Sequence, residues 1–103
     1  MFNMKDLLAQ AQGFQSKLAS MQEELAEKTV IGSSGGDMVR VEITGTMDIV
    51  SVKIENEIID VEEKDLLESL IAAAVNDATN KSKEVATQEM SKLTGGLKIP
   101  GLF

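Results

Sequence analysis

The first long hydrophobic pattern covers residues 4–28, where apolar side chains recur at alternating spacings of three and four. Its members are Met4, Leu7, Ala11, Phe14, Leu18, Met21 and Leu25. Glutamine and glutamate, which are good helix formers, occupy most of the positions between them. Because this spacing puts the apolar side chains on one stripe, the sequence predicts an amphipathic helix over residues 3–28, about 38 Å long.

After Lys28 the period of the pattern changes from 3.6 to two. The alternating apolar residues are Val39, Val41 and Ile43 in one run and Val50, Val52 and Ile54 in the next. The turn-forming sequences Gly32-Ser33-Ser34-Gly35-Gly36 and Gly45-Thr46-Met47-Asp48 separate these runs from each other and from the β-branched residues at 29–31. We therefore expect three antiparallel strands at about residues 29–33, 38–44 and 49–55, each with one buried face.

A second helix is predicted over residues 61–94. Asp60-Val61-Glu62-Glu63 resembles a capping box, and no glycine or proline follows until Gly95-Gly96. Residues 95–103 form an apolar tail that contains Leu97, Ile99, Leu102 and Phe103. The whole pattern indicates one domain, 1–103, of the α+β class: a long helix, a three-stranded antiparallel sheet and a second long helix.

Residues 66–75 are apolar on nearly all sides of the second helix, since only Glu68 and Ser69 are polar. A three-stranded sheet covers one side of such a helix, so a second copy of the chain is needed for the other. The sequence thus predicts a homodimer whose interface contains Leu66, Leu67, Leu70, Ile71, Ala74 and Val75. The later positions of this helix are smaller, which favours antiparallel packing against the first helix as an arm beyond the sheet.

The composition argues against catalysis and against a membrane protein. Histidine, cysteine, tryptophan and tyrosine are absent, so the usual neutral-pH proton shuttle and thiol chemistry are missing. We expect no enzyme activity, no cofactor and no metal site, because the acidic residues at 55–65 lack the spacing of a calcium loop. No apolar run approaches the roughly 20 residues of a membrane helix, and the first residues lack the features of a secretion signal, so a cytoplasmic location is expected.

The net charge is −7, but the charges are unevenly distributed. Residues 18–77 hold four basic and fourteen acidic side chains, whereas residues 1–17 and 78–103 together hold six lysines and three acids. Both basic segments are expected at the far tip of the arm, where lysines can meet phosphate groups. The candidates for DNA binding are Lys5, Lys17, Lys81, Lys83, Lys92 and Lys98. Ordinary solubilising lysines are the alternative interpretation.

The chain resembles the YbaB/EbfC nucleoid-associated proteins along nearly its whole length. The similar segments are Met4-Lys5, Met21-Gln22-Glu23-Glu24-Leu25, Gly32-Ser33-Ser34-Gly35-Gly36, Val50-Ser51-Val52-Lys53-Ile54, Ala74-Val75-Asn76-Asp77-Ala78 and the glycine-rich stretch around Gly95-Gly96. The resemblance implies a tweezer-like homodimer in the bacterial cytoplasm, bound to double-stranded DNA through protruding helices. It also implies a role in organising the nucleoid or modulating transcription, with no catalytic site.

The residues alone also allow a second hypothesis, in which the partner is a protein and not DNA. A dimeric helical clamp could grasp another protein through its arms and its apolar tail, since exposed apolar segments favour such contacts. The same tail could instead fold back over the arm. Salt separates the two hypotheses, because phosphate binding weakens steeply as salt rises.

Overall fold

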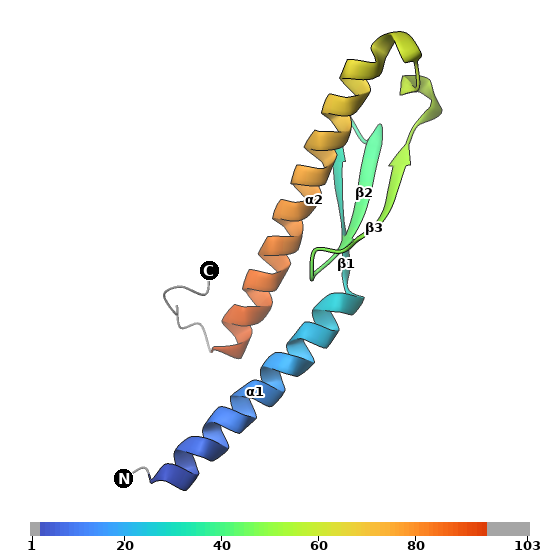
Figure 1. Cartoon of the computed structure of the whole chain (residues 1–103). Coiled ribbons are helices and arrows are strands. Elements are labelled where there is room, and N and C mark those ends of the chain that lie inside the picture. Colours follow the sequence, from blue (N-terminus) through green and yellow to red (C-terminus); the bar gives the residue numbers. More distant parts are fainter. Residues whose placement is uncertain (1–2, 95–103) are drawn as a thin grey trace.

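A computed structural model describes residues 3–94, which form two long helices and one antiparallel sheet (Figure 1). The elements are α1 (Met4–Glu27), β1 (Thr29–Ser34), β2 (Val39–Thr44), β3 (Ile49–Ile54) and α2 (Lys64–Leu93). This arrangement confirms the α+β class predicted from the sequence. The molecule is elongated, with extents of 70 × 23 × 16 Å.

The first helix begins at a side-chain cap and ends where the β-branched residues start. The Asn3 side chain accepts a hydrogen bond from the Asp6 backbone N–H at 2.9 Å, which satisfies one of the free donors of the first turn. At the other end, the Lys28 N–H donates to the Glu24 carbonyl. Of the apolar stripe, only Met21 and Leu25 are buried, so most of α1 lies outside the hydrophobic core.

The core lies between one face of the sheet and α2. The strands follow the order β1-β2-β3, and α2 packs across β1 and β2 (Figure 1). The alternating residues of β2 point toward the helix, and the fully buried cluster consists of Val39, Val41, Ile43, Ala74 and Ala78. Small residues on α2 therefore let the helix approach the sheet closely.

The first turn is shorter than the five-residue loop predicted at 32–36. Gly32, Ser33 and Ser34 continue β1, and the chain reverses at residues 35–38, where Gly35, Gly36 and Asp37 have positive φ angles. Within the strand, Gly32 lies against α2, because the Ala78 backbone occupies the space where a Cβ would lie. A glycine is needed at this position because the helix contacts the sheet there, and not because the chain turns.

The second helix begins three residues later than predicted. Two short 3₁₀ turns, Asn56–Ile58 and Val61–Glu63, connect β3 to α2. The Asp60 carboxylate accepts a hydrogen bond from the Glu62 N–H at 2.9 Å, two residues on, which fits a 3₁₀ turn. The acidic cap was therefore located correctly, but it starts the tighter turn, and the α-helix begins at Lys64.

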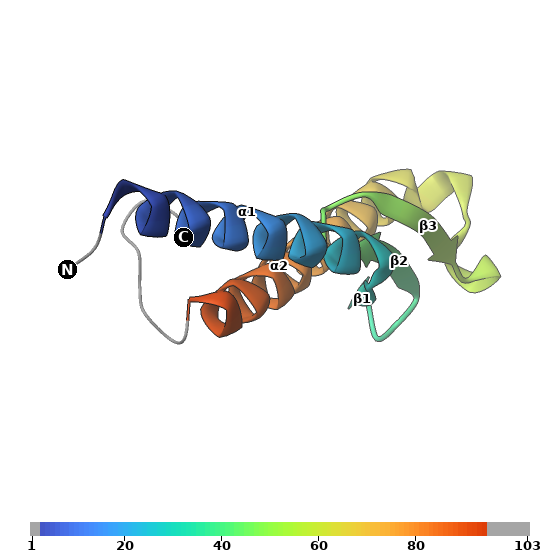
Figure 2. The same ribbon diagram turned by 90° about the horizontal axis from the view of Figure 1, so that it is seen from below.

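Both helices extend beyond the sheet at the same end of the molecule. Figure 2 shows α1 and α2 reaching away from the strands in the same direction, with the chain running toward the sheet in α1 and away from it in α2. The first turns of α1 continue past the last turn of α2 (Figure 1). We refer to this pair, residues 4–27 and 83–93, as the arm.

Candidate nucleic-acid interface

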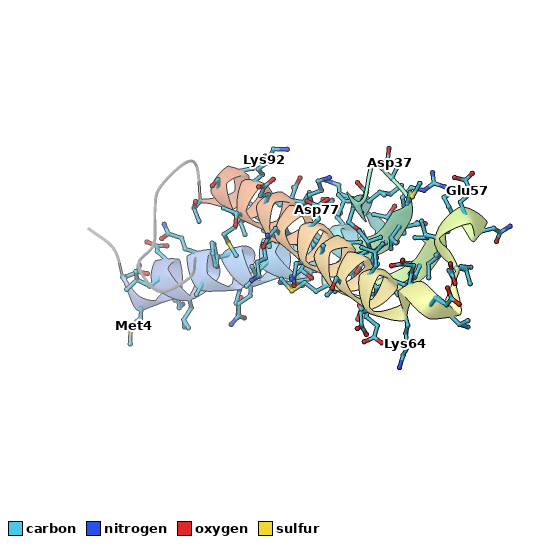
Figure 3. All side chains as sticks on the ribbon, turned by 90° about the horizontal axis from the view of Figure 1, so that it is seen from above. Met4, Asp37, Glu57, Lys64, Asp77 and Lys92 are labelled. Atoms are coloured by element: carbon cyan, nitrogen blue, oxygen red, sulfur yellow. The ribbon has the colours of Figure 1, made fainter. Side chains whose placement is uncertain are left out.

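The densest group of acidic side chains, at residues 55–68, lies toward the opposite end of the molecule from Lys92. Figure 3 shows Met4 and Lys92 at one end, and Glu57 and Lys64 at the other. Seven of the seventeen acidic residues lie at residues 55–68, around the 3₁₀ turns and the first turns of α2, whereas six lie on the arm helices: Asp6, Glu23, Glu24, Glu27, Glu84 and Glu89. The separation of charge that the sequence predicted is therefore only partial among the described residues, because the arm itself carries six acidic side chains and four lysines.

Two of the predicted lysines line one groove between the helices. The groove has a volume of about 370 Å³ and is lined by Ser16, Lys17, Ser20, Met21, Glu24, Glu89, Lys92 and Leu93. Ser16 and Ser20 are one helical turn apart, so both hydroxyls are on the α1 face that borders α2. Two ammonium groups and two hydroxyls can donate to phosphate oxygens, although the carboxylates of Glu24 and Glu89 line the same groove and Glu89 pairs with Lys92.

An ion-pair cluster closes the end of this groove that is nearer the sheet. Lys28 Nζ lies 2.8 Å from Glu89 Oε1, and Lys92 Nζ lies 3.4 Å from the same oxygen. The hydrogen bond from Lys28 holds the pKa of Glu89 below its ordinary value, and the same bond raises the pKa of Lys28. Lys28 is thus occupied in linking the base of α1 to α2.

Lys81 lies beside β1, so the prediction that it belongs to the arm tip is wrong. Its Nζ is 3.2 Å from the Ile31 carbonyl oxygen and 3.1 Å from Asp77 Oδ2. The same Asp77 oxygen accepts a hydrogen bond from the Ser33 N–H at 2.9 Å, which together with Lys81 holds the pKa of Asp77 below its ordinary value. The physical reason is that more than half of the length of α2 lies over the sheet. Position 81 is still within this part of the helix and lies beside β1.

The remaining lysine candidates are dispersed. Lys5 lies in the first turn of α1, twelve residues and so about 18 Å along the helix from Lys17. Lys83 borders a second groove on the helix pair, together with Met47 and Met90. Lys98 lies outside the described residues. The six candidates therefore do not share one surface, and Lys17 with Lys92 is the pair that the structure brings to one groove.

The predicted dimer interface needs one clear correction. Ala74 is fully buried in the core of its own chain, so its place in an interface with a second copy is wrong. Leu67, Leu70, Ile71 and Val75 are partly buried against the same core. They face the sheet because β1 and β2 cover that side of α2. Leu66 is 51% exposed and remains open to a partner.

The two edges of the sheet differ. Side chains of α2 cover the free edge of β1, because Asp77 and Lys81 bind the outward-pointing N–H of Ser33 and carbonyl of Ile31. β3 forms the other edge, away from α2 (Figure 1), and its Ile49, Val50 and Val52 are about half exposed. One edge is therefore protected against strand addition, and the apolar β3 edge is not.

Sequence reasoning missed several polar residues of the arm. Ser16, Ser20 and Glu89 were not singled out, although Ser16 and Ser20 have the i, i+4 spacing that marks one face of a helix. Asp77 and Lys81 have the same spacing, which signals a local ion pair and could have removed Lys81 from the candidates. Glu89 had no such signal, because its main partner, Lys28, is 61 residues away.

Residues 3–94 offer neither an acidic metal site nor a membrane-spanning helix. No group of three or more acidic side chains in this range is placed to hold a metal ion. In the same range, neither helix is long and apolar enough to cross a membrane.

The fold and the arm define a class of elongated α+β proteins whose two helices project from a small sheet and carry exposed lysines. The chain belongs to the YbaB/EbfC DNA-binding family, whose family model matches residues 1–97. This confirms the resemblance seen in the sequence.

Similar proteins agree with this assignment. The chain is 50% identical over 95 residues to a nucleoid-associated protein of Syntrophobacter fumaroxidans, in an alignment that covers 92% of this chain and 86% of the relative. It is 45% identical to a nucleoid-associated protein of Caldanaerobacter subterraneus, covering 99% and 92%. The crystal structure of an uncharacterized protein from Helicobacter pylori has a TM-score of 0.82 at 20% identity, over 92% of this chain and 100% of that one, which supports the fold.

Proposed function

We propose that this protein is a nucleoid-associated, DNA-binding homodimer that contacts duplex DNA through its helical arms. The observation that carries the proposal is membership of a DNA-binding family, together with relatives that are named nucleoid-associated proteins. Such a protein works in the bacterial cytoplasm on the nucleoid, where it organises DNA or modulates transcription. This function requires no catalytic site and no cofactor.

The side chains that line the groove between the helices support the proposal, because they include donors for phosphate oxygens. Lys17 and Lys92 supply positive charge, and Ser16 and Ser20 supply neutral donors, without any arrangement specific for base edges. The acidic sheet end does not cancel this attraction, because the 30 residues of α2 extend about 45 Å and charges are screened over about 8 Å at physiological salt. The charge of the distant sheet end is therefore no obstacle to phosphate contact at the arm, whereas Glu24 and Glu89, which line the groove itself, oppose it.

The open side of the sheet supports the homodimer. Ile49 and Val52 on β3 and Leu66 on α2 expose apolar surface that α2 of the same chain leaves uncovered. A second copy related by two-fold symmetry offers the same apolar residues in return, so both uncovered surfaces become buried together. Two arms then project from one central body, and two separate contacts with one duplex strengthen binding by raising the effective concentration.

A titration of labelled duplex DNA at two salt concentrations tests the DNA-binding function. Fluorescence anisotropy is expected to rise with micromolar protein at about 50 mM salt, and affinity is expected to fall steeply as the salt is raised. No change in anisotropy at low salt would reject DNA binding by this protein.

Paired variants test the groove separately. Lys17→Gln with Lys92→Gln is expected to lower the slope of log affinity against log salt by up to about 1.8 per protomer, since each lost phosphate contact removes about 0.9. Lys64→Gln is the matched control, because this exposed lysine lies in the first turn of α2 at the acidic end. An unchanged slope in the double variant would move the contact elsewhere while leaving DNA binding itself intact.

Sedimentation at micromolar concentration tests the dimer. Val52→Asp places a charge on the open face and is expected to convert a dimer into a monomer, since burying an unpaired charge opposes association. Ile31→Asp is the matched control, because Ile31 is similarly exposed but lies on β1 at the covered edge. A monomeric unmodified protein, or equal effects of both variants, would reject this interface.

A protein partner is the second candidate, favoured by the apolar groove that contains Met21, Leu25, Met47, Ala86 and Met90. Met-lined grooves adapt to varied partner side chains. Partner binding of this kind tolerates salt, so the DNA titration separates the two functions.

A further inference from the structure

The apolar stripe of α1 is buried at one end and open at the other. Its exposed fractions rise steadily from 2% at Leu25 and 7% at Met21 to 39% at Phe14, 51% at Leu7 and 76% at Met4. The buried end packs against α2 and the sheet, whereas the open end lies beyond the last turn of α2 (Figure 1). Nothing among the described residues covers Phe14, Leu7 and Met4.

The same stripe continues without interruption from its buried part to its open part. The spacings of three and four place Met21, Leu18, Phe14, Leu7 and Met4 on one side of the helix. Because Met21 lines both grooves that border α2, the open residues continue the surface that α2 already covers. The segment that covers them must therefore approach from the end of α2.

The residues that follow α2 start beside this surface. Leu93, the last residue of α2, lines the groove with Ser16, Lys17 and Ser20, so the chain leaves α2 alongside the middle of α1. Residues 95–103 begin with two glycines, which allow the chain to change direction, and then contain four large apolar residues. These are Leu97, Ile99, Leu102 and Phe103.

The length of this segment matches the open stripe. Nine residues span at most about 30 Å when extended. The stripe from the level of Lys17 to Met4 is thirteen residues of helix, which is about 20 Å. The segment can therefore reach the whole open stripe with a few residues to spare.

We propose that residues 97–103 dock on the open stripe of α1 in the same chain and complete the hydrophobic packing of the arm. The short connection gives the segment a local concentration in the millimolar range, which a separate protein reaches only at high expression. A second copy of α1 is a weaker occupant, because in the proposed dimer the β3 faces meet and the arms project away from them. The inference concerns the free protein and holds whether or not the arm binds DNA.

A nitroxide spin label tests the docking directly. The chain has no cysteine, so Gln10→Cys introduces a single attachment site next to Leu7 and Phe14 on α1. The label is expected to broaden the NMR signals of residues 97–103 in the full chain. The same label at Glu57→Cys, at the opposite end of the molecule, is the control and is expected to leave these signals sharp (Figure 3).

Amide hydrogen exchange gives a second readout. Covering the stripe restrains fraying of α1, so amides in residues 8–18 are expected to exchange at least about tenfold more slowly in the full chain than in a chain that lacks residues 97–103. The variant Leu102→Asp with Phe103→Asp is expected to behave like the shortened chain, because it keeps the length and removes the apolar contacts.

Three results would overturn the inference. The first is sharp signals for residues 97–103 with the label at position 10, and the second is equal exchange in the full and shortened chains. The third is broadening seen only when spin-labelled chains are mixed with isotope-labelled, nitroxide-free chains, since the segment then lies on α1 of the partner subunit.

Discussion

Gly32 controls how closely α2 approaches the sheet, and replacing it with alanine gives a sharp test of that contact. A Cβ at this position would lie 2.6 Å from the Ala78 Cβ and closer still to the Ala78 backbone N and Cα. Ordinary contacts between such atoms are about 3.5–4.0 Å. The helix and β1 must therefore separate by about 1 Å or more to admit one methyl group.

The expected loss of stability follows from what this separation opens. The core cluster of Val39, Val41, Ile43, Ala74 and Ala78 lies between the same two surfaces, and a gap of 0.5–1 Å removes roughly a quarter to a half of each dispersion contact. Overpacking usually costs about 1–3 kcal/mol. Because backbone atoms cannot rotate away, we expect Gly32→Ala to lie at or above about 3 kcal/mol.

Urea unfolding followed by circular dichroism measures this change in the free energy of unfolding. All variants are compared at one protein concentration, because the stability of an oligomer depends on concentration. Gly13→Ala is the control: no atom lies within 4 Å of a Cβ there, and helix propensity predicts a gain of about 1 kcal/mol. Adding Ala78→Gly to Gly32→Ala is expected to give little rescue, since the closest atoms belong to the backbone. A Gly32→Ala protein as stable as the original would refute the close-contact argument.

Two further predictions concern polar contacts between α2 and the sheet. The pKa of Asp77 is lower in the folded than in the unfolded protein, where it is about 3.9. The ionised carboxylate therefore stabilises the fold at pH values above about 3.9, and this stabilisation disappears as the pH falls through the folded-state pKa. Asp77→Asn should therefore lower the urea midpoint at about pH 7, and its effect should shrink as the pH is lowered from about 4 through the folded-state pKa; an effect that does not change with pH would contradict the assignment. Ser82 is buried and donates a hydrogen bond to the Thr44 carbonyl at 2.8 Å. Ser82→Ala should therefore lower the free energy of unfolding in urea by about 1 kcal/mol relative to the control Ser91→Ala, which changes an exposed serine. Equal stabilities of the two variants would show that the bond contributes nothing.

The sequence predicted the secondary structure well where periodicity was long and consistent. α1 and α2 were expected at 3–28 and 61–94 and lie at Met4–Glu27 and Lys64–Leu93. The main errors fell on short segments whose conformation depends on distant residues. From the sequence, Gly32 was assigned to a turn, because its contact with Ala78 is not visible there. The residues after Asp60 were assigned to an α-helix, whereas the structure has a 3₁₀ turn at this point.

The arm was harder to predict than the fold, because charge counts do not specify where α2 leaves the sheet. Lys81 and Lys92 are equivalent in a count of basic residues, yet Lys81 binds β1 and Lys92 lines the inter-helix groove. Assigning them requires knowing that α2 crosses the sheet with more than half of its residues. That depends on the contacts of Gly32 and Ala78, which set the position of the helix along the strand and leave no trace in the pattern of polar and apolar residues.

The orientation of α1 is set by a small number of contacts at its base. The Gly45 N–H donates hydrogen bonds to the carbonyl oxygens of both Leu25 and Lys28, at 2.9 and 3.0 Å, and a Cβ on Gly45 would lie only 2.8 Å from the Leu25 oxygen. The Lys28–Glu89 ion pair adds a second link to α2. Because these contacts lie at one end of a 24-residue helix, a small change in angle there displaces Met4 by many times the local shift. The direction in which α1 projects from the sheet therefore depends on the contacts of Gly45, Leu25 and Lys28.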